Sequence, residues 1–235
     1  MYSIQYRDLG VKDYKETWDY QEELHGAIVK QKLVNQKLDP AMQKPTEDYV
    51  LFVEHPHVYT LGKSGDAHNL LIQENYLRSI GATFYKINRG GDITYHGPGQ
   101  LVGYPIIDLE HYGLSVKNYI HLLEDAIIEL LAAFFEIKAS HMDGATGVWL
   151  DAQTPGRARK ICAIGVRISR YVSMHGFALN VSTDLEYFRH INPCGFIDKG
   201  VTSIEKEIGE KPDMQKIKDF LFHSIQSKLN ALANA

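Results

Sequence analysis

The chain has 235 residues, 44% of them hydrophobic and 23% charged, and a formal net charge of −4, a composition typical of one globular domain over residues 1–235 or of two lobes sharing a sheet. No basic field favours a nucleic-acid partner, and no apolar run approaches the roughly 20 residues of a membrane span. The N-terminus lacks the basic and apolar regions of a signal peptide, and two cysteines, Cys162 and Cys194, provide no disulfide framework. We therefore expect a soluble cytoplasmic protein with free thiols.

Hydrophobic patterning in the first half of the chain predicts short strands around one long helix. The expected elements, in order, are an edge strand at 2–7, an amphipathic helix at 14–37, strands at 49–54 and 58–62, a short helix at 74–80 and a strand at 83–87. We expect the strands at 49–54 and 58–62 to form a hairpin across the turn His55-Pro56-His57. The polar segment 31–48 carries no chemistry that its residues reveal.

The second half continues with strands and two longer helices. Residues 101–109 form a strand interrupted by Gly103 and Pro105, which indicates a bulge or an edge position. Ser115 is a good N-cap for the clearest amphipathic helix. The other expected elements are a strand at 148–150, a hairpin of strands at 160–168 and 172–181, a short helix at 184–190, a tight turn at 192–195 and a C-terminal helix from about residue 213. The predicted fold class is α/β (α+β), with a mixed, largely antiparallel sheet flanked by amphipathic helices.

The segment 89–100 concentrates unusual residues. Five of its twelve positions are glycine or proline, and two glycine-rich turns bracket the strand-like triplet Ile93-Thr94-Tyr95. Glycine lets a ligand approach bare backbone N–H groups, while Arg89 and His96 add a fixed charge and a titratable ring. Because neither GxGxxG nor GxxxxGK[ST] is present, the segment is interpreted as a cradle for a polar, flat or anionic group rather than a standard nucleotide loop.

Two side chains further along are candidates for catalysis. Cys194 lies in a turn between proline and glycine, where backbone N–H groups can stabilise a thiolate, whereas Cys162 lies in an apolar strand and is interpreted as a small core residue. Lys160 ends a basic run and opens an apolar strand, so it can lose its proton more readily than a solvated lysine and act as a base. His96 and His175 leave a Cys–His dyad open as an alternative.

Metal chemistry has little support in the sequence. Eleven histidines are present, but neither HExxH nor CxxC occurs. His55 and His57 are interpreted as polar residues of a surface turn. We therefore expect no metal and no cofactor.

Taken together, these motifs resemble the lipoyl(octanoyl) transferase family of the biotin/lipoate protein ligase superfamily. The matching segments are RGGDITYHGPGQLVGYPIIDL (89–109), GVWL (147–150), KICAIGVRI (160–168), HGFALNV (175–181) and INPCG (191–195). The resemblance extends from about residue 49 to about residue 205, and it implies a biotin/lipoate protein ligase catalytic-domain-like fold.

The resemblance implies transfer of an octanoyl or lipoyl group from acyl carrier protein to a lysine of lipoyl domains. By analogy with the family, Cys194 carries the acyl thioester, and Lys160 favours its thiolate and moves protons. The acceptors would be lipoyl domains of 2-oxoacid dehydrogenase complexes and the glycine cleavage H protein, and we expect a monomer. The residues implied to line the acyl site are Arg89, Gly90, Gly91, Asp92, Ile93, Thr94, Tyr95, His96, Ala163, Ile164, Gly165, Gly176, Phe177 and Ala178.

Two other functions stay open at this point. An ATP-dependent lipoate-protein ligase would activate the acid as an adenylate, and Cys194 argues against it because adenylation needs no nucleophilic thiol. A non-catalytic protein that binds acyl chains or lipoyl domains would not depend on Cys194. For either macromolecular partner, typically acidic in this family, a docking patch is hypothesised from arginines near the site in sequence, namely Arg157, Arg159, Arg167, Arg170 and Arg189.

Overall fold

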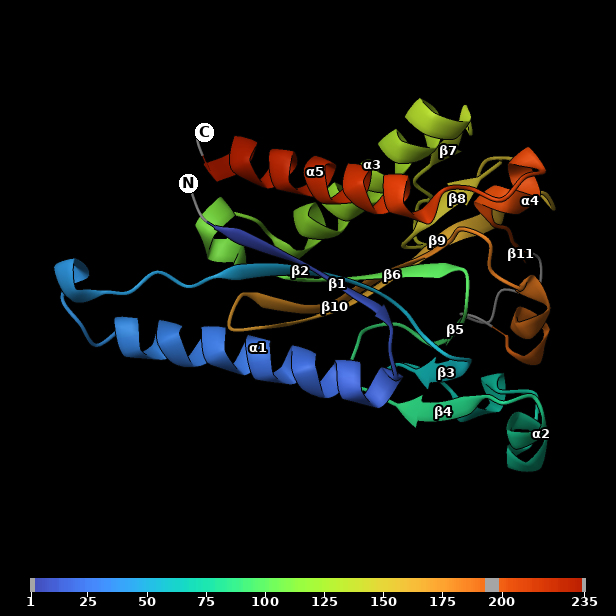
Figure 1. The fold of residues 1–235 in the computed structure, drawn as a ribbon, viewed down its shortest axis with the longest axis horizontal. Coiled ribbons are helices and arrows are strands. Elements are labelled where there is room, and N and C mark those ends of the chain that lie inside the picture. Colours follow the sequence, from blue (N-terminus) through green and yellow to red (C-terminus); the bar gives the residue numbers. More distant parts are fainter. Residues whose placement is uncertain (1–2, 193–198, 234–235) are drawn as a thin grey trace.

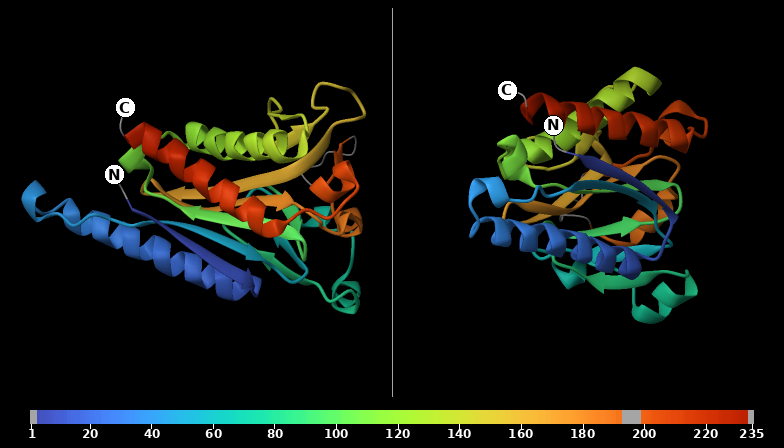
Figure 2. Two further views of the ribbon diagram at one scale, coloured as in Figure 1. Left: turned by 45° about the horizontal axis from the view of Figure 1, so that its top comes forward. Right: turned by 60° about the vertical axis from the view of Figure 1, so that its left-hand side comes forward.

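The computed structural model describes residues 3–192 and 199–233. A twisted sheet forms the centre of this part of the chain (Figure 1). Helix α1 (Tyr14–Asn35) covers one face, and helices α3 (Val116–Phe135) and α5 (Met214–Ala233) cover the other, as the turned view in Figure 2 shows. None of the described helices is both long and apolar enough to cross a membrane.

The large sheet has eight strands. Its main path has the order β1 (Ile4–Val11), β2 (Asp48–Glu54), β6 (Gln100–Ile106), β10 (Val172–Asn180), β9 (Arg159–Ser169), β8 (Val148–Leu150) and β7 (Ala139–Ser140). The eighth strand, β11 (Gly200–Val201), pairs with β9. The β1–β2 and β11–β9 pairs are parallel and the other pairs are antiparallel, so the predicted mixed, largely antiparallel sheet is confirmed.

A second, smaller sheet lies beside one end of the large one (Figure 1). Its strands have the order β4 (Thr83–Lys86), β3 (Val58–Leu61) and β5 (Ile93–His96). Among the described residues, the short helices are α2 (Glu74–Ser79), α4 (Ile204–Ile208) and four 3-10 helices, η1 (Pro40–Met42), η2 (Ala67–Asn69), η3 (Leu109–Tyr112) and η4 (Leu185–His190). Most predicted elements are therefore present, with ends that differ by a few residues.

The predicted hairpin of β2 and β3 is wrong. Both sides of β2 are occupied, by β1 and by β6, while β3 pairs with β4 and β5 in the small sheet. The turn at 55–57 instead carries the chain from one sheet to the other. His55, expected at the surface, is fully buried, with its ring nitrogens 2.7 Å from the Lys12 carbonyl oxygen and 2.9 Å from the Tyr104 hydroxyl. His57 is half-buried and stacks on Tyr187 with ring centroids 4.1 Å apart.

Strand β6 is a central strand, not the bulged or edge strand that was predicted. It lies between β2 and β10, and no register shift interrupts either pairing. Its pairing with β10 covers residues 100–103 and stops before Pro105, which has no N–H to donate. Gly103 is required by packing, because a Cβ there would collide with the Phe177 ring.

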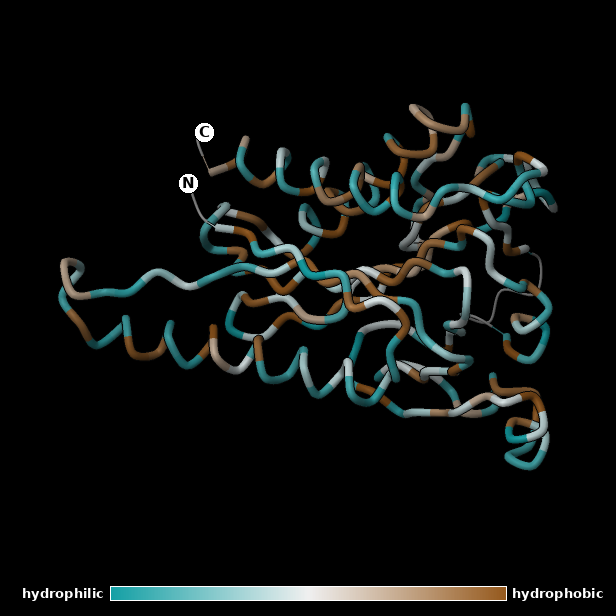
Figure 3. The backbone as a smooth tube through the Cα atoms, viewed as in Figure 1, coloured by the Kyte–Doolittle hydropathy of each residue, from teal (hydrophilic) through white to brown (hydrophobic). Residues whose placement is uncertain are grey.

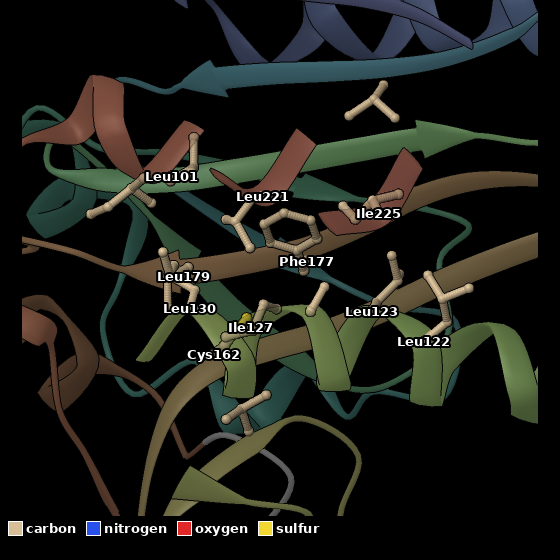
Figure 4. Close-up of a cluster of buried hydrophobic side chains, with 14 of the residues drawn as sticks. Leu101, Leu122, Leu123, Ile127, Leu130, Cys162, Phe177, Leu179, Leu221 and Ile225 are labelled. Carbon is tan, nitrogen blue, oxygen red and sulfur yellow. The ribbon is translucent and has the colours of Figure 1, made fainter. Parts of the chain in front are cut away.

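The main hydrophobic core lies between the large sheet and helices α3 and α5. Ser115 caps α3 as predicted, since its hydroxyl accepts a hydrogen bond from the Asn118 amide at 3.2 Å. Hydrophobic and hydrophilic stretches alternate along α5 (Figure 3), as expected for a helix with one face on a sheet. The predicted amphipathic pattern of α1 is weak, because half of its buried residues are polar, namely Thr17, Gln21 and His25. Figure 4 shows core side chains of α3 and α5 meeting those of the sheet, among them Leu101, Leu123, Ile127, Leu130, Cys162, Phe177, Leu179, Leu221 and Ile225. Burial raises the pKa of the Cys162 thiol well above its ordinary value, so the prediction of Cys162 as a core residue is confirmed.

Candidate active site

A cavity of about 590 Å³ opens where the glycine-rich segment 89–96 meets the β9–β10 hairpin. Helices α1 and α3, the turn at 144–146 and the residues around β11 complete its wall. Its apolar lining includes Val102, Val116, Ile120, Ile164 and Phe177. The cavity therefore combines an apolar surface with the backbone of the segment that the sequence singled out.

Most of the predicted site residues line this cavity. They are Lys160, Arg89, Gly90, Gly91, Asp92, Ile93, Thr94, His96, Ala163, Ile164, Gly165, Gly176, Phe177 and Ala178. Tyr95 does not line it. Side chains alternate along β5, and the Tyr95 ring packs in the hydrophobic cluster of the small sheet, with its hydroxyl 2.7 Å from His57 Nδ1.

Cys194 lies outside the described residues, in the segment 193–198. The described chain reaches the cavity on both sides of this segment, because Phe188 precedes it, Lys199 follows it and both line the wall. The residues just before this segment are hydrogen-bonded to residues 69–71, next to the small sheet. The Asn192 amide donates to the Asn69 carbonyl at 2.9 Å, and the Leu71 amide donates to the His190 carbonyl at 2.9 Å.

Glycines let three backbone segments approach one another at the cavity. The Gly90 amide donates to the Val166 carbonyl at 3.0 Å, which joins the glycine-rich segment to β9. A Cβ on Gly165 would lie 2.9 Å from the Gly90 carbonyl oxygen. A Cβ on Gly176, the cross-strand partner of Gly165, would collide with the Gly103 carbonyl. These glycines are therefore required for close backbone contact, and the pairing of β9 with β10 runs past them without a bulge.

Arg89 is a buried cation in the cavity wall. One terminal nitrogen donates to the carbonyl and hydroxyl oxygens of Thr60, at 2.7 and 3.0 Å, and the other donates to the Gly90 carbonyl at 3.0 Å. The guanidinium thus ties the glycine-rich segment to strand β3. Together with burial, its positive charge lowers the pKa values of the two histidines in the cavity wall, His96 and His175.

His96 and His175 are both neutral at pH 7. Burial, followed by the charges of His55 and Arg89 among other groups, lowers the pKa of His96 to about 3. Burial and the Arg89 charge likewise lower the pKa of His175 to about 3. His96 Nδ1 lies 2.8 Å from the Gln100 side-chain oxygen, and His175 Nε2 lies 2.8 Å from that of Asn88. Such neutral rings are weak bases, so the two histidines are better suited to hydrogen bonding than to proton abstraction.

Lys160 is the second residue of strand β9, and its amine points at the turn 143–147. Nζ donates to the Thr146 carbonyl at 3.1 Å and lies 4.6 Å from the centroid of the Trp149 ring. Both contacts favour the charged ammonium. On its other side, Lys160 pairs in parallel with Val201, which is also part of the cavity wall.

Two arginines near Lys160 in the sequence are paired with carboxylates. Arg159 is held by Asp151 and by a two-bond contact with Glu207, at 2.7 Å for each nitrogen. Arg167 pairs with Glu22 at 2.9 Å. In the hypothesised docking patch, Arg157, Arg170 and Arg189 are exposed, and the side-chain exposure is 72% for Arg157 and 76% for Arg189.

Several residues of the site had no distinguishing signal in the sequence. Tyr14 shares the helical spacing of core residues, yet its ring lines the cavity and stacks on His96 with centroids 5.8 Å apart. Thr146 sits in an ordinary turn but supplies the carbonyl that holds Lys160. Trp149 was noted within a motif, and its contact with Lys160 follows from the β8–β9 pairing.

A family model and similar proteins of known name agree on the family to which this sequence is similar. The model of the lipoyl protein ligase A/B catalytic domain matches residues 13–226. The octanoyltransferase of Christiangramia forsetii is 54% identical over 229 residues, which cover 97% of this chain and 96% of the relative. The octanoyltransferase of Flavobacterium johnsoniae is 57% identical over 216 residues, which cover 92% of this chain and 91% of the relative.

A solved structure shows the same fold at low sequence identity. The bipartite lipoate protein ligase of Thermoplasma acidophilum, studied with its E2 lipoyl domain, has a TM-score of 0.67 at 12% identity. The match covers 100% of this chain and 91% of that one. The predicted ligase-like catalytic fold is therefore confirmed.

Proposed function

This chain belongs to the lipoyl protein ligase A/B catalytic-domain family and is an acyltransferase of its octanoyltransferase group, and we propose that it transfers an octanoyl or lipoyl group from acyl carrier protein to a lysine of lipoyl domains through a thioester on Cys194. The acceptors in this proposal are the lipoyl domains of 2-oxoacid dehydrogenase complexes and the glycine cleavage H protein. The observation that carries the proposal is the placement of the Lys160 amine on the wall of an acyl-sized apolar cavity, to which the chain leads on both sides of Cys194. Because close relatives are octanoyltransferases, a non-catalytic binding protein is not retained as an alternative.

In the first step, the Cys194 thiolate attacks the thioester carbonyl of the donor. A new carbon–sulfur bond forms to Cys194, the bond to the carrier's sulfur breaks, and the leaving thiolate takes a proton from the Lys160 ammonium. The Thr146 carbonyl and the Trp149 ring support this charged starting form of Lys160. Exchange of one thioester for another is nearly balanced in free energy, so the step requires an activated thiol and no nucleotide.

In the second step, the amine of the acceptor lysine attacks the Cys194 thioester. The amide bond forms, the carbon–sulfur bond breaks, and the amine proton passes to Lys160, which is neutral after the first step. The enzyme thereby returns to a thiolate and an ammonium. Backbone N–H groups of the glycine-rich segment are candidates to stabilise the oxyanion in both steps.

The acyl tail accounts for the apolar part of the cavity. An octanoyl group has seven carbons beyond its carbonyl, and burying them contributes roughly 5–6 kcal/mol before losses, at about 0.8 kcal/mol per carbon. Val102, Ile164 and Phe177 supply apolar surface for this tail. The neutral His96 and His175 rings avoid placing two further charges beside it.

Intact-protein mass spectrometry tests the proposal directly. Incubation with octanoyl-acyl carrier protein is expected to add one octanoyl unit to the wild-type chain, and subsequent addition of a lipoyl domain should remove it. Cys194→Ser should abolish the adduct. If Cys194→Ser acquires the same adduct and retains turnover, the thioester mechanism is wrong.

A parallel assay separates the remaining alternative. An ATP-dependent ligase would modify the lipoyl domain with free octanoate and ATP, and it would not need Cys194. We expect no product from free octanoate with ATP and full product from the carrier thioester without ATP. The reverse pattern would identify a ligase.

A further inference from the structure

A cluster of ligand-type side chains lies outside the cavity, between helix α3 and the segment that follows β7. His121 and Glu124 are three residues apart on one face of α3, and His141 directly follows β7. The Nδ1 atoms of His121 and His141 lie 3.0 and 2.8 Å from the same oxygen, Oε2 of Glu124. The three ligand atoms lie within 4.8 Å of one another.

The buried carboxylate of this cluster has an unusual set of partners. The Glu124 side chain is only 4% exposed, and in the described part of the chain its ion-pair partners are both histidines. A buried carboxylate is costly unless hydrogen bonds and a compensating charge surround it. The other two buried carboxylates of the described residues, Asp48 and Asp108, also contact a histidine, His111, but each has a further side-chain partner: Asp48 accepts from the Tyr112 hydroxyl, and Asp108 pairs with the Lys32 ammonium.

Outer partners orient two of the three side chains. The other ring nitrogen of His141, Nε2, lies 2.8 Å from Asp125 Oδ1. The other oxygen of Glu124, Oε1, accepts the Gly147 amide at 2.8 Å. A histidine that presents one nitrogen to a site and gives the other N–H to a carboxylate is the arrangement found around bound metal ions.

We propose that His121, Glu124 and His141 bind a divalent transition-metal ion, with Zn²⁺ as the best-matched ion. Two imidazoles and one carboxylate are a ligand set that Zn²⁺ takes readily, with a fourth position left for water. Ligand atoms around tetrahedral zinc are about 3.3 Å apart for bonds of about 2.0–2.1 Å. The separations of 2.8 and 3.0 Å lie slightly below this value, and the two histidine nitrogens lie within 4.8 Å of each other, so side-chain rotations can bring the three atoms to tetrahedral spacing. This inference does not depend on the proposed function.

The proposed metal site is connected to the cavity wall through Gly147, whose amide donates a hydrogen bond to Glu124 and which directly follows the wall residue Thr146. Gly147 has φ 122° and ends the turn whose Thr146 carbonyl holds the Lys160 amine. A Cβ at Gly147 would lie 2.5 Å from the Cys162 carbonyl oxygen, so the turn packs tightly against β9. A metal that fixes the Glu124 carboxylate also fixes the Gly147 amide, and it thereby stabilises the support of Lys160.

Calorimetric titration with zinc chloride tests the proposal. The full chain should carry no affinity tag, and Cys194→Ser should be present in every sample so that the thiol does not compete for metal. We expect saturable binding of one Zn²⁺, and a rise in Tm of about 5–10 °C at one hundred times Kd. Co²⁺ should give a tetrahedral spectrum without a thiolate charge-transfer band, which would exclude the cysteines as ligands.

Variants assign the ligands. His121→Gln with His141→Gln should abolish the binding and the Tm rise. Their side chains are 44% and 39% exposed, and circular dichroism will verify the fold. Asp125→Asn, which removes an outer partner and no ligand, should weaken binding about 10- to 100-fold.

The matched control is His68→Gln, which alters an exposed His–Asp pair that lacks a third ligand. It should leave Zn²⁺ binding unchanged. The proposal is overturned if the Cys194→Ser chain binds no Zn²⁺, or if its affinity survives in the double histidine variant.

Discussion

The Lys160 amine rests on the face of the Trp149 ring, 4.6 Å from its centroid. Trp149 is in turn fixed by its indole N–H, which donates to the Ala145 carbonyl at 2.8 Å, one residue before the carbonyl that accepts from Lys160. The turn 143–147 therefore positions the Lys160 amine through two contacts. The Thr146 carbonyl accepts its hydrogen bond, and the Ala145 carbonyl fixes the Trp149 ring on which the amine lies. This arrangement presents Lys160 as a positioned ammonium at the cavity wall.

Lys160→Ala should lower kcat by about 10²- to 10⁴-fold, the usual contribution of a positioned acid–base group. The fold should persist, because Lys160 is not fully buried. Steady-state transfer from octanoyl-acyl carrier protein measures the effect, and Lys117→Ala, an exposed lysine on α3, is the control. Wild-type turnover in Lys160→Ala would contradict the proposed role.

Gly165→Ala should impair acyl transfer while Gly26→Ala should not. The added methyl at 165 would lie 2.9 Å from the Gly90 carbonyl oxygen and displace the glycine-rich segment from β9. A displacement of about 1 Å at a substrate-positioning segment lowers kcat/KM about 10- to 100-fold. Gly26 is an exposed helical residue with open space around it, and alanine there should stabilise the fold by about 0.5–1 kcal/mol. Equal kcat/KM values for the two variants would refute the close-contact role of Gly165.

Stability should fall as the pH drops below about 6.5, the ordinary pKa of histidine. Burial lowers the pKa of His55 to about 4 and the pKa values of His96 and His175 to about 3, so the unfolded chain takes up protons that the folded chain refuses. Each of these histidines should therefore cost about 2 kcal/mol of unfolding free energy between pH 6.5 and pH 5.

Urea unfolding at a series of pH values measures this loss. His175→Asn should reduce the slope by about one proton, since asparagine does not titrate and tolerates the φ of 61° at this position. A His175→Asn slope equal to that of the wild type would show that His175 is protonated in the folded state.

Tyr187→Ala should destabilise the helix η4 that leads toward Cys194. The ring stacks on His57 and Tyr95, with centroids 4.1 and 4.9 Å away, and each such pair is worth about 0.5–1.5 kcal/mol. We expect a loss of about 1–3 kcal/mol in urea unfolding together with reduced kcat. Tyr187→Phe keeps the stack and loses only hydroxyl contacts of 3.3 Å, so it should remain close to wild type. An equal effect of both variants would assign the role to the hydroxyl.

Arg157→Glu should raise KM for the acidic acyl carrier protein severalfold at low salt, and less at high salt. Arg157 is the better test of the docking patch, because Arg159 is committed to Asp151 and Glu207, and its replacement would break that network. Lys37→Glu, at the exposed end beyond α1, provides a charge-matched control. Identical KM values for Arg157→Glu and Lys37→Glu would remove Arg157 from the patch.

Local features of the fold were predictable because their causes are local. The cap at Ser115 and the β9–β10 hairpin follow from a few adjacent residues. The hairpin of β2 and β3 failed because closeness in sequence does not reveal which strand edges are already occupied. His55 failed for a related reason: the neighbouring proline marks a turn, but the turn lies between two sheets and is covered.

In the candidate site, too, some residues were predictable from the sequence and others were not. The glycine-rich segment and Lys160 were visible as unusual residues, and the resemblance joined them to one family. Tyr14 was not visible, since helical spacing is the same for a ring in the core and a ring in a cavity. The cluster of His121, Glu124 and His141 was missed because His141 lies on a different segment from the other two, so the three match no contiguous motif.

Phe177 belongs both to the wall of the cavity and to the main hydrophobic core. Ile164 and Val166 occupy the same double position on β9. One layer of side chains therefore separates the cavity from the main hydrophobic core. Under the proposed function, a substitution that changes the packing of this layer should therefore change both the stability of the fold and the acyl chain length that the cavity accepts.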